Sequence, residues 1–374
     1  MNKWFFLSKT VWLAFLLHSA LIFAGTLLSD QLSLHLATGF INQSLSASSP
    51  FIEKFMRWDA HWYTYIAEHG YDIRTVVFFP VIIALIKLAS YTGLSYSDAG
   101  FFVCNTFALV SFYVMYALIR LDFSEQHTLR ALLAYSVMPT SFFLNSIYTE
   151  PIFISLSITC IYFSRRGWWW PAGIFAALSA LTRNLGIFLF FFMLFEFILT
   201  YKKKRKYKPS VIPLLVAPFA LFCYMIYNLA LTGDSLAFAN SQQAWGRYFS
   251  YPWMNYWNSL SILILQPRAI EPADILDPII VLLTLTGLIF LTFSPKFKIR
   301  QSYLVLGWLW FLIPLFSTSS WQPLYSLSRF VLIIFPLYIF LAQIRKDIFY
   351  YYLAISTIGL VVCTALFNNW FWLG

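Results

Sequence analysis

Long apolar runs recur from one end of the chain to the other, and they restrict the fold more than any other feature. Of 374 residues, 60% are hydrophobic and only 11% are charged, and the mean hydropathy is +0.71. Soluble domains carry about 25% charged residues. A helix needs about 20 apolar residues to cross a bilayer. The sequence therefore predicts an all-α, polytopic transmembrane protein, with residues 1–374 forming a single integral membrane domain.

About eleven stretches are candidate spans, and because a span needs about 20 apolar residues, several of them are short or tilted. They cover residues 10–29, 98–119, 129–146, 149–164, 168–182, 186–200, 211–231, 275–293, 303–317, 328–344 and 349–368. Another apolar stretch, 76–92, is interrupted by Pro80 and Lys87. Residues 30–75 and 232–274 contain no run of spanning length, and we expect them to form two large loops.

Lysine and arginine side chains set the predicted orientation, because they accumulate in cytoplasmic loops. The basic positions are Lys3, Lys9, Arg120, Arg130, Arg165, Arg166 and residues 202–206, 296–300 and 345–346. Placing them inside puts the N-terminus in the cytoplasm and both large loops outside. The net charge of +10 is then a signature of topology, and we expect no nucleic-acid partner.

Two segments need a separate interpretation. In this orientation both ends of 76–92 lie outside, so we interpret it as re-entrant or lying along the surface, since broken backbone at membrane depth is tolerated when it is buried in protein. The run from Val11 to Leu28 is long enough to span, and we expect it to be retained as the first helix rather than removed as a signal peptide.

A dense polar and aromatic stretch follows the first span. Residues 57–63 read Arg-Trp-Asp-Ala-His-Trp-Tyr. Its carboxylate, Asp59, has two interpretations. It is either structural, as a helix cap or as the ion-pair partner of Arg57, or it is a general base. A base at the membrane surface would accept the proton of a sugar hydroxyl as that hydroxyl attacks an activated anomeric carbon.

Aromatic and imidazole side chains surround this carboxylate in the sequence. The rings of Trp58, Trp62 and Tyr63 offer flat apolar faces to the C–H surfaces of a sugar. His61 and His69 are eight residues apart, which fits no standard zinc motif. We therefore predict no metal site and expect both histidines to hydrogen-bond to a substrate or to the carboxylate.

Three further charged residues lie beside apolar segments. Glu150 lies in a very short turn between two expected spans, where it is either exposed in the loop or buried at a cost that indicates a function. Arg183 lies in a similar place, and a phosphate at the bilayer surface is a natural partner for its guanidinium. Arg329 is a second candidate for that role. We predict that Asp59, Arg183 and Arg329 share one external cavity.

Familiar catalytic and nucleotide-binding motifs are absent from the sequence. It contains no Walker loop, GxSxG, HExxH, CxxC or dinucleotide fingerprint. A sugar donor would therefore have to arrive already activated, and the outer leaflet supplies polyprenyl-phosphate sugars. The four cysteines show no metal-ligand or disulfide spacing and are expected to be small apolar residues: Cys104, Cys160, Cys223 and Cys363.

The order of several motifs resembles the second mannosyltransferase of GPI-anchor synthesis and its prokaryotic relatives. The matching stretches are residues 57–63, 66–71, 78–80, Pro139, 145–150, 180–186, 233–238, 243–245, 328–330 and 335–336. That family belongs to the C-type glycosyltransferases, polytopic helical enzymes that use polyprenyl-phosphate sugars. They carry an acidic residue in the first external loop, which the resemblance places among juxtamembrane helices within residues 30–75.

The resemblance also implies roles for individual residues. Asp59 matches the family's catalytic aspartate. The remaining motif residues are expected to bind the substrates: Arg57, Trp58, His61, Trp62, Tyr63, His69, Tyr148, Glu150, Arg183, Asn184, Gln243, Trp245 and Arg329. The chain departs from the family pattern at 184–186, where Asn-Leu-Gly replaces the usual serine–asparagine–glycine, and at Ala60 and His61. These departures leave the acceptor open.

Together these features predict an inverting membrane glycosyltransferase of a prokaryotic plasma membrane, with an extracytoplasmic active site. It would move mannose or a related hexose from a polyprenyl phosphate to a lipid or glycan acceptor, with Asp59 as general base. The chemistry requires no cofactor, although it is compatible with a divalent ion. One alternative is a lipid or polysaccharide transporter or flippase, which usually has mid-membrane polar residues and internal repeats. Another is a structural subunit of an envelope complex.

Overall fold

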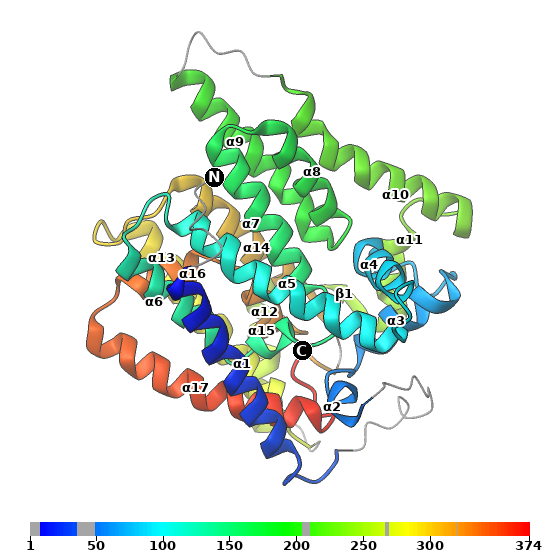
Figure 1. Ribbon diagram of the computed structural model, residues 1–374. Helices are drawn as coiled ribbons and strands as arrows, with labels where there is room; N and C mark the ends of the chain where they lie inside the picture. Colours follow the sequence, from blue (N-terminus) through cyan, green and yellow to red (C-terminus); the bar gives the residue numbers. More distant parts are fainter. Residues whose placement is uncertain (1–7, 36–48, 204–209, 266–268, 320) are drawn as a thin grey trace. The chain divides into compact units, whose positions relative to one another are not determined.

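The computed structural model describes residues 8–374, apart from 36–48, 204–209, 266–268 and 320 and the side chains of Lys202, Lys203, Ala244 and Trp245. The described chain is almost entirely helical, with one small antiparallel sheet in which β1 (Arg247–Phe249) pairs with β2 (Ser317–Ser319). It divides into two compact units. Unit 1 comprises residues 1–44, 123–143 and 242–374, and unit 2 comprises 45–122 and 144–241 (Figure 1).

Unit 2 is a helical unit that contains most of the predicted site residues. Its α-helices are α2 (Pro50–Glu53), α3 (Asp59–His69), α4 (Pro80–Ser90), α5 (Tyr96–Ile119), α7 (Glu150–Arg166), α8 (Trp169–Ala180), α9 (Phe188–Lys203), α10 (Val216–Thr232) and α11 (Ala237–Asn240), with 3-10 turns η3 (Asn184–Ile187) and η4 (Ile212–Leu215). Ser95 caps α5, since its Oγ accepts the N–H of Asp98 at 3.1 Å. Gly167 ends α7 in the left-handed conformation. Helix α7 packs against both α5 and α8, and α10 packs on α8.

Unit 1 contains the helices at both ends of the described chain. Its α-helices are α1 (Lys9–Ser29), α6 (Glu125–Ser136), α12 (Pro252–Leu265), α13 (Pro272–Phe293), α14 (Gln301–Leu315), α15 (Leu327–Val331), α16 (Pro336–Gln343) and α17 (Lys346–Asn368); the 3-10 turns η2 (Ser141–Leu144) and η5 (Ser241–Trp245) lie at its boundaries. Helix α1 packs against α6 and α17. A Cβ on Gly25 would lie 2.6 Å from Cβ of Thr364, so the contact between α1 and α17 requires glycine.

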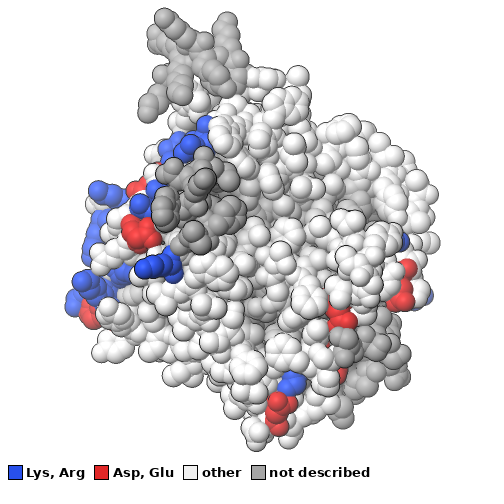
Figure 2. All heavy atoms as spheres, in the orientation of Figure 1, with Lys and Arg blue, Asp and Glu red and all other residues white. Residues whose placement is uncertain are grey.

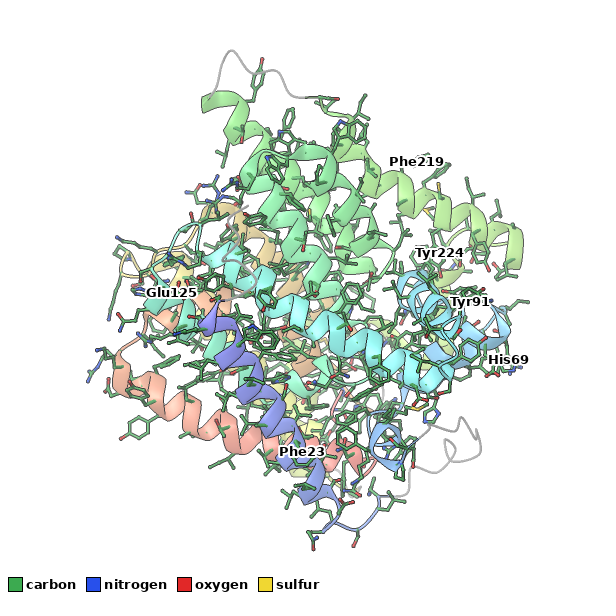
Figure 3. All side chains as sticks on the ribbon, viewed as in Figure 1. Phe23, His69, Tyr91, Glu125, Phe219 and Tyr224 are labelled. Carbon is green, nitrogen blue, oxygen red and sulfur yellow. The ribbon has the colours of Figure 1, made fainter. Side chains whose placement is uncertain are left out.

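Among the residues that the structure describes, six helical segments are long and apolar enough to cross a membrane: Lys9–Ser29, Tyr96–Ile119, Asn184–Tyr201, Ile212–Thr232, Pro272–Phe293 and Lys346–Asn368. Their outer faces expose large apolar side chains, as Phe219 does where it projects from α10 (Figure 3). Most of the face in Figure 2 carries no charged side chain, and its lysines and arginines gather mainly in one area. The chain is therefore a multi-pass helical membrane protein.

Two of the expected spans are not single helices. Residues 129–146 divide into α6, which ends at Ser136, and the short turn η2 beyond Pro139. Proline lacks the N–H of a helical residue and restricts the residue before it. Residues 328–344 divide into α15 and α16, and α16 begins at Pro336. Helix α4 has only 11 residues. The eleven spans, their orientation and the re-entrant path of 76–92 stay predictions.

Candidate active site

Asp59 is the first residue of α3. The residue before it, Trp58, has a φ of 53°, in the left-handed region that a bulky side chain rarely adopts. Asp59 is partly exposed, and a carboxylate in a first helical turn is stabilised by the helix dipole. The cap position itself belongs to Trp58. An acidic residue is therefore favoured at this position of the helix, and its carboxylate is accessible to a ligand.

Arg57 is fixed within the protein. Its side chain is 4% exposed, and Nη1 donates to the carbonyls of Glu53 at 2.6 Å and Met56 at 3.0 Å. Its guanidinium also forms an ion pair with the Glu53 carboxylate at 3.6 Å. Burial lowers the pKa of Arg57 to about 10, while Glu53 raises it, so the group stays cationic at neutral pH. Arg57 is thus a fixed positive charge close to Asp59 in the chain.

His61 is buried inside the same unit. Burial lowers its pKa below the ordinary value of 6.5, and the charge of Arg57 lowers it further. The imidazole is therefore neutral at neutral pH, with one nitrogen that donates and one that accepts hydrogen bonds. This agrees with a hydrogen-bonding role rather than a charged one.

Aromatic rings support α3 from both sides. Tyr63 makes edge-to-face contacts with Phe78, at 5.3 Å between ring centroids, and with Tyr148, at 6.4 Å. Trp62 stacks on Phe78 with centroids 6.1 Å apart. Two of the predicted sugar-facing rings therefore also pack within the protein.

The turn at residues 145–150 is joined to the segment that precedes α3. The hydroxyl of Tyr148 donates to the main-chain carbonyl of Arg57 at 3.1 Å, and the N–H of Ile147 donates to the carbonyl of Phe55 at 3.3 Å. Tyr148 is completely buried. Two motifs that are far apart in the sequence thus form one structure.

Glu150 and Arg183 form an ion pair. The Glu150 side chain is 0% exposed and that of Arg183 is 10% exposed, with its guanidinium 5.9 Å from the ring centre of Phe153. Glu150 is therefore buried rather than loop-exposed. The arginine predicted to meet a phosphate has a carboxylate partner within the protein.

A third connection involves residues 78–81. The N–H of Val81 donates to the carbonyl of Leu181 at 3.1 Å. Two tyrosines that the sequence did not single out hold the preceding loop: Tyr71 donates to the carbonyl of Phe78 at 2.7 Å, and Tyr224 donates to that of Val76 at 2.7 Å. Tyr224 lies within an apolar run, and Tyr71 ends the matched stretch 66–71, but neither context predicts such a bond.

One predicted residue, His69, lies apart from this centre. His69 is at the other end of α3 from Asp59, about 15 Å along the helix axis, so these two side chains do not hydrogen-bond to each other. Its ring is exposed and stacks on Tyr65 with centroids 4.6 Å apart (Figure 3). Asn184 is also exposed. The expected contact between His69 and Asp59 is therefore wrong.

The remaining predicted residues belong to unit 1. Arg329 lies on α15, is 6% exposed, and its guanidinium is 5.6 Å from the ring centre of Phe143 and 5.4 Å from that of Phe330. Gln243 is exposed, and the side chain of Trp245 lies outside the described residues. The common cavity of Asp59, Arg183 and Arg329 stays a prediction.

Fold and site define a multi-pass, all-helical membrane protein in which a partly exposed carboxylate adjoins buried cationic, aromatic and imidazole groups. No family model matches the chain. Over 196 residues the sequence is 27% identical to GPI alpha-1,6-mannosyltransferase 2 of Mus musculus. The alignment covers 46% of this chain and 40% of the mouse protein, which is less than half of each. The chain is thus similar, at a distance, to a mannosyltransferase.

Proposed function

We propose that this protein is a membrane glycosyltransferase that transfers mannose or a related hexose from a polyprenyl-phosphate donor to a lipid or glycan acceptor. The observation that carries the proposal is the joining of three motifs in unit 2. Tyr148 bonds to Arg57, and Glu150 pairs with Arg183, so that residues 57–63, 145–150 and 181–186 adjoin one another. The similarity to a mannosyltransferase supports the same reaction class.

In the proposed reaction Asp59 is the general base. An acceptor hydroxyl attacks the anomeric carbon of the donor and gives its proton to the Asp59 carboxylate. The bond between that carbon and the phosphate oxygen breaks, and its electron pair leaves with the polyprenyl phosphate. One displacement of this kind inverts the anomeric configuration. The products are the glycosylated acceptor and a polyprenyl phosphate.

The surrounding side chains would orient the reactants. Arg57 supplies a fixed positive charge, and neutral His61, which also interacts with the backbone of Met56, is proposed to hydrogen-bond to a sugar hydroxyl. Arg183 and Arg329 are the proposed groups for stabilising the leaving phosphate. Glu150 pairs with Arg183, so a phosphate bound there would share its guanidinium with that carboxylate. We further propose that the active site is extracytoplasmic and that the protein belongs to a prokaryotic plasma membrane.

The test is label transfer by purified protein. Wild-type protein in detergent is incubated with radiolabelled polyprenyl-phosphate mannose and crude lipid or glycan acceptors. We expect label in the acceptor fraction with the wild type and none with Asp59→Asn. The matched control is Glu68→Gln, which removes an exposed carboxylate from the same helix and should transfer normally.

Two results would contradict the proposal. If the Asp59→Asn protein transferred label at the wild-type rate, Asp59 would not be the general base. Movement of the mannosyl lipid across reconstituted vesicles without any covalent transfer would instead favour a flippase. Normal folding of each variant is checked by its melting temperature in the same detergent.

A further inference from the structure

Unit 1 contains a group of buried polar side chains that the proposed reaction does not use. They are Asp277 on α13 and three residues in or before α15, namely Gln322, Ser326 and Ser328. All four are 0% exposed. In the sequence Asp277 is an acid inside an apolar run and Ser328 belongs to the matched stretch 328–330, but no role was predicted for either.

Hydrogen bonds gather this group around Ser328. Its N–H donates to Oδ1 of Asp277 at 3.0 Å, its hydroxyl donates to the carbonyl of Leu373 at 3.3 Å, and its carbonyl accepts the hydroxyl of Thr140 at 3.1 Å. The side chains of Gln322 and Ser328 also interact with the Asp277 carboxylate, although the Gln322 amide does not meet the strict geometry of a hydrogen bond. Four separate stretches of unit 1 therefore converge at one polar point.

Several polar atoms of this group have unused hydrogen-bonding capacity. Oδ2 of Asp277, both amide atoms of Gln322 and Oγ of Ser326 are buried, and within the described part of the chain none meets the geometry of a hydrogen bond. Buried polar groups are nearly always satisfied, because burial removes their hydration. Such a set indicates a polar occupant next to Asp277.

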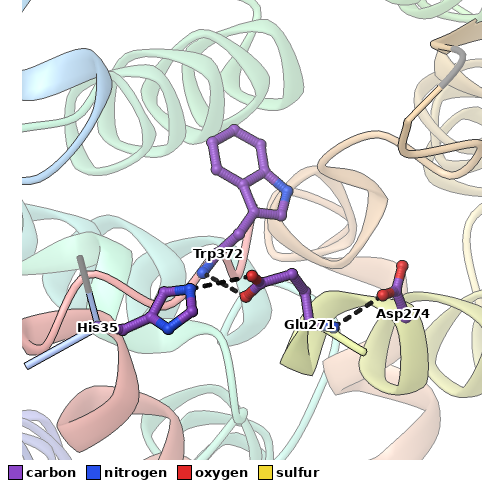
Figure 4. Close-up of polar contacts among 4 residues, drawn as sticks. All are labelled: His35, Glu271, Asp274 and Trp372. Carbon is purple, nitrogen blue, oxygen red and sulfur yellow. Dashed lines mark hydrogen bonds and ion pairs between the residues drawn. The ribbon is translucent and has the colours of Figure 1, made fainter. Parts of the chain in front are cut away.

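The nearby Asp274 shows the contrast. Its Oδ2 accepts the N–H of Glu271 at 2.8 Å, in the capping box that starts α13 (Figure 4). The Glu271 carboxylate lies 3.1 Å from Nε2 of His35 and accepts the N–H of Trp372 at 3.3 Å. The first turn of α13 is thus a closed structural network, and the unused capacity lies one turn further on, at Asp277.

The chemistry of the group fits hydroxyl ligands better than a metal ion. The carboxylate accepts hydrogen bonds, whereas the amide of Gln322 and the hydroxyl of Ser326 both donate and accept. A sugar hydroxyl also does both, so neighbouring hydroxyls of a hexose can satisfy an acid and an amide together. A divalent cation needs about six or more oxygen ligands and would leave the amide N–H groups unmet.

We propose that Asp277, Gln322 and Ser326 form the hexose subsite for a lipid-linked sugar phosphate whose phosphate is bound by Arg329. Arg329 directly follows Ser328 and is itself buried. The choice of ligand rests on the proposed function. The assignment of these residues to sugar binding goes beyond it.

Ser326→Gly is the most informative variant. Ser326 has a φ of 60°, in the left-handed region that favours glycine, so the change removes the hydroxyl without adding strain. We expect an unchanged or higher melting temperature and about tenfold weaker binding of a short-chain polyprenyl-phosphate mannose. Binding of the same polyprenyl phosphate without the sugar should not change. If the Ser326 hydroxyl had only a structural role, Ser326→Gly would lower the melting temperature. It would also weaken the binding of both lipids equally.

Gln322→Met provides a second variant, since it keeps the volume of the side chain while removing the amide. Its control is Thr364→Val, in the same unit, because Thr364 is also buried and its hydroxyl donates to the carbonyl of Leu360 at 2.7 Å. Calorimetric titration in detergent should show weaker binding of the mannosyl lipid to Gln322→Met only. Equal affinity of both variants and the wild type would mean that the group holds ordered water, and this would overturn the subsite.

Binding and transfer are measured separately, so the two proposals can fail separately. Suppose that the wild type transfers label while Ser326→Gly and Gln322→Met bind the mannosyl lipid as tightly as the wild type does. The hexose subsite is then rejected, and the glycosyltransferase proposal is kept. If the variants lose that affinity but the wild type transfers nothing to any acceptor, the subsite stands and the glycosyltransferase proposal is wrong. Absence of mannosyl-lipid binding by the wild type would also overturn the subsite.

Discussion

The hydroxyl of Tyr148 donates a hydrogen bond of 3.1 Å to the main-chain carbonyl of Arg57. The same turn carries Glu150, which pairs with Arg183. One short segment therefore anchors both the start of α3, where Asp59 lies, and the turn that leads into α9. We expect its geometry to control the position of Asp59.

Tyr148→Phe should lower both stability and turnover. It removes one buried hydrogen bond, which contributes about 1 kcal/mol to the free energy of unfolding, and releases the segment before Asp59. Melting temperature and label transfer are the measurements. Tyr91→Phe is the control, because Tyr91 is 76% exposed (Figure 3). A Tyr148→Phe protein indistinguishable from Tyr91→Phe would show that the bond does not position Asp59.

The buried ion pair should be strongly coupled. Glu150→Gln leaves the Arg183 guanidinium buried without its counter-charge, which typically costs about 3–5 kcal/mol. Adding Arg183→Met should recover part of that loss, as a double-mutant cycle can measure. Asp122→Asn should cost at most about 1 kcal/mol, because its pair with Arg165 is more exposed, at 30% and 11%. If the changes in the free energy of unfolding caused by Glu150→Gln and Arg183→Met were strictly additive, the two side chains would not be coupled.

Stability should fall in mild acid because of His61. Its pKa in the folded protein lies below the ordinary 6.5, so between the two values the unfolded chain binds more protons than the folded one. The free energy of unfolding therefore decreases as pH drops through about 6.5 and levels off below the folded pKa. Melting temperatures from pH 8 to pH 5 should fall less steeply for His61→Gln than for the wild type. Parallel curves would exclude His61 as the cause.

Gly186→Ala should disrupt the turn that carries Arg183. A Cβ at Gly186 would lie 2.3 Å from the main-chain carbon of Ser179, and neither backbone can move far inside a packed unit. We expect a large drop in melting temperature together with loss of transfer. Gly359→Ala is the comparison, since its Cβ would meet only the side chain of Pro139, at 3.2 Å. A stable and active Gly186→Ala protein would contradict this packing.

The side of the membrane reached by the α4–α5 turn tests the topology. A cysteine at Thr92 should react with an impermeant external reagent, whereas one at Gln126 should not, since both residues are exposed but we place them on opposite sides. Both cysteines are introduced into the Cys223→Ser variant, because Cys223 is exposed and would itself react. The other three native cysteines are buried. Labelling of Thr92→Cys from the cytoplasmic side only would reject the re-entrant interpretation of residues 76–92.

Periodicity and composition predicted the helical membrane class, because long apolar runs have few other solutions. They did not predict where such runs break. Apolar residues continue beyond Pro139, as Phe142, Phe143 and Leu144, yet α6 ends at Ser136. Hydrophobicity alone therefore overstated the continuity of that span.

The charged residues were located by their sequence context, but their partners were not. The cost of burying charge singled out Glu150 and Arg183 separately, whereas only the fold shows that they neutralise each other. Arg57 pairs with Glu53, one helical turn earlier in the chain. The left-handed backbone of Trp58 had no sequence signal at all, since most residues in that conformation are glycine or asparagine.

The pairing of α1 with α17 has a consequence for biogenesis. Asn368 donates to the hydroxyl of Thr26 at 3.2 Å, and Asn369 donates to the carbonyl of Ser29 at 2.8 Å. Helix α1 is synthesised well before α17, so it receives these partners only after α17 has also been made. Until then the polar groups of α1 that face α17, the hydroxyl of Thr26 and the carbonyl of Ser29, lack these amide donors.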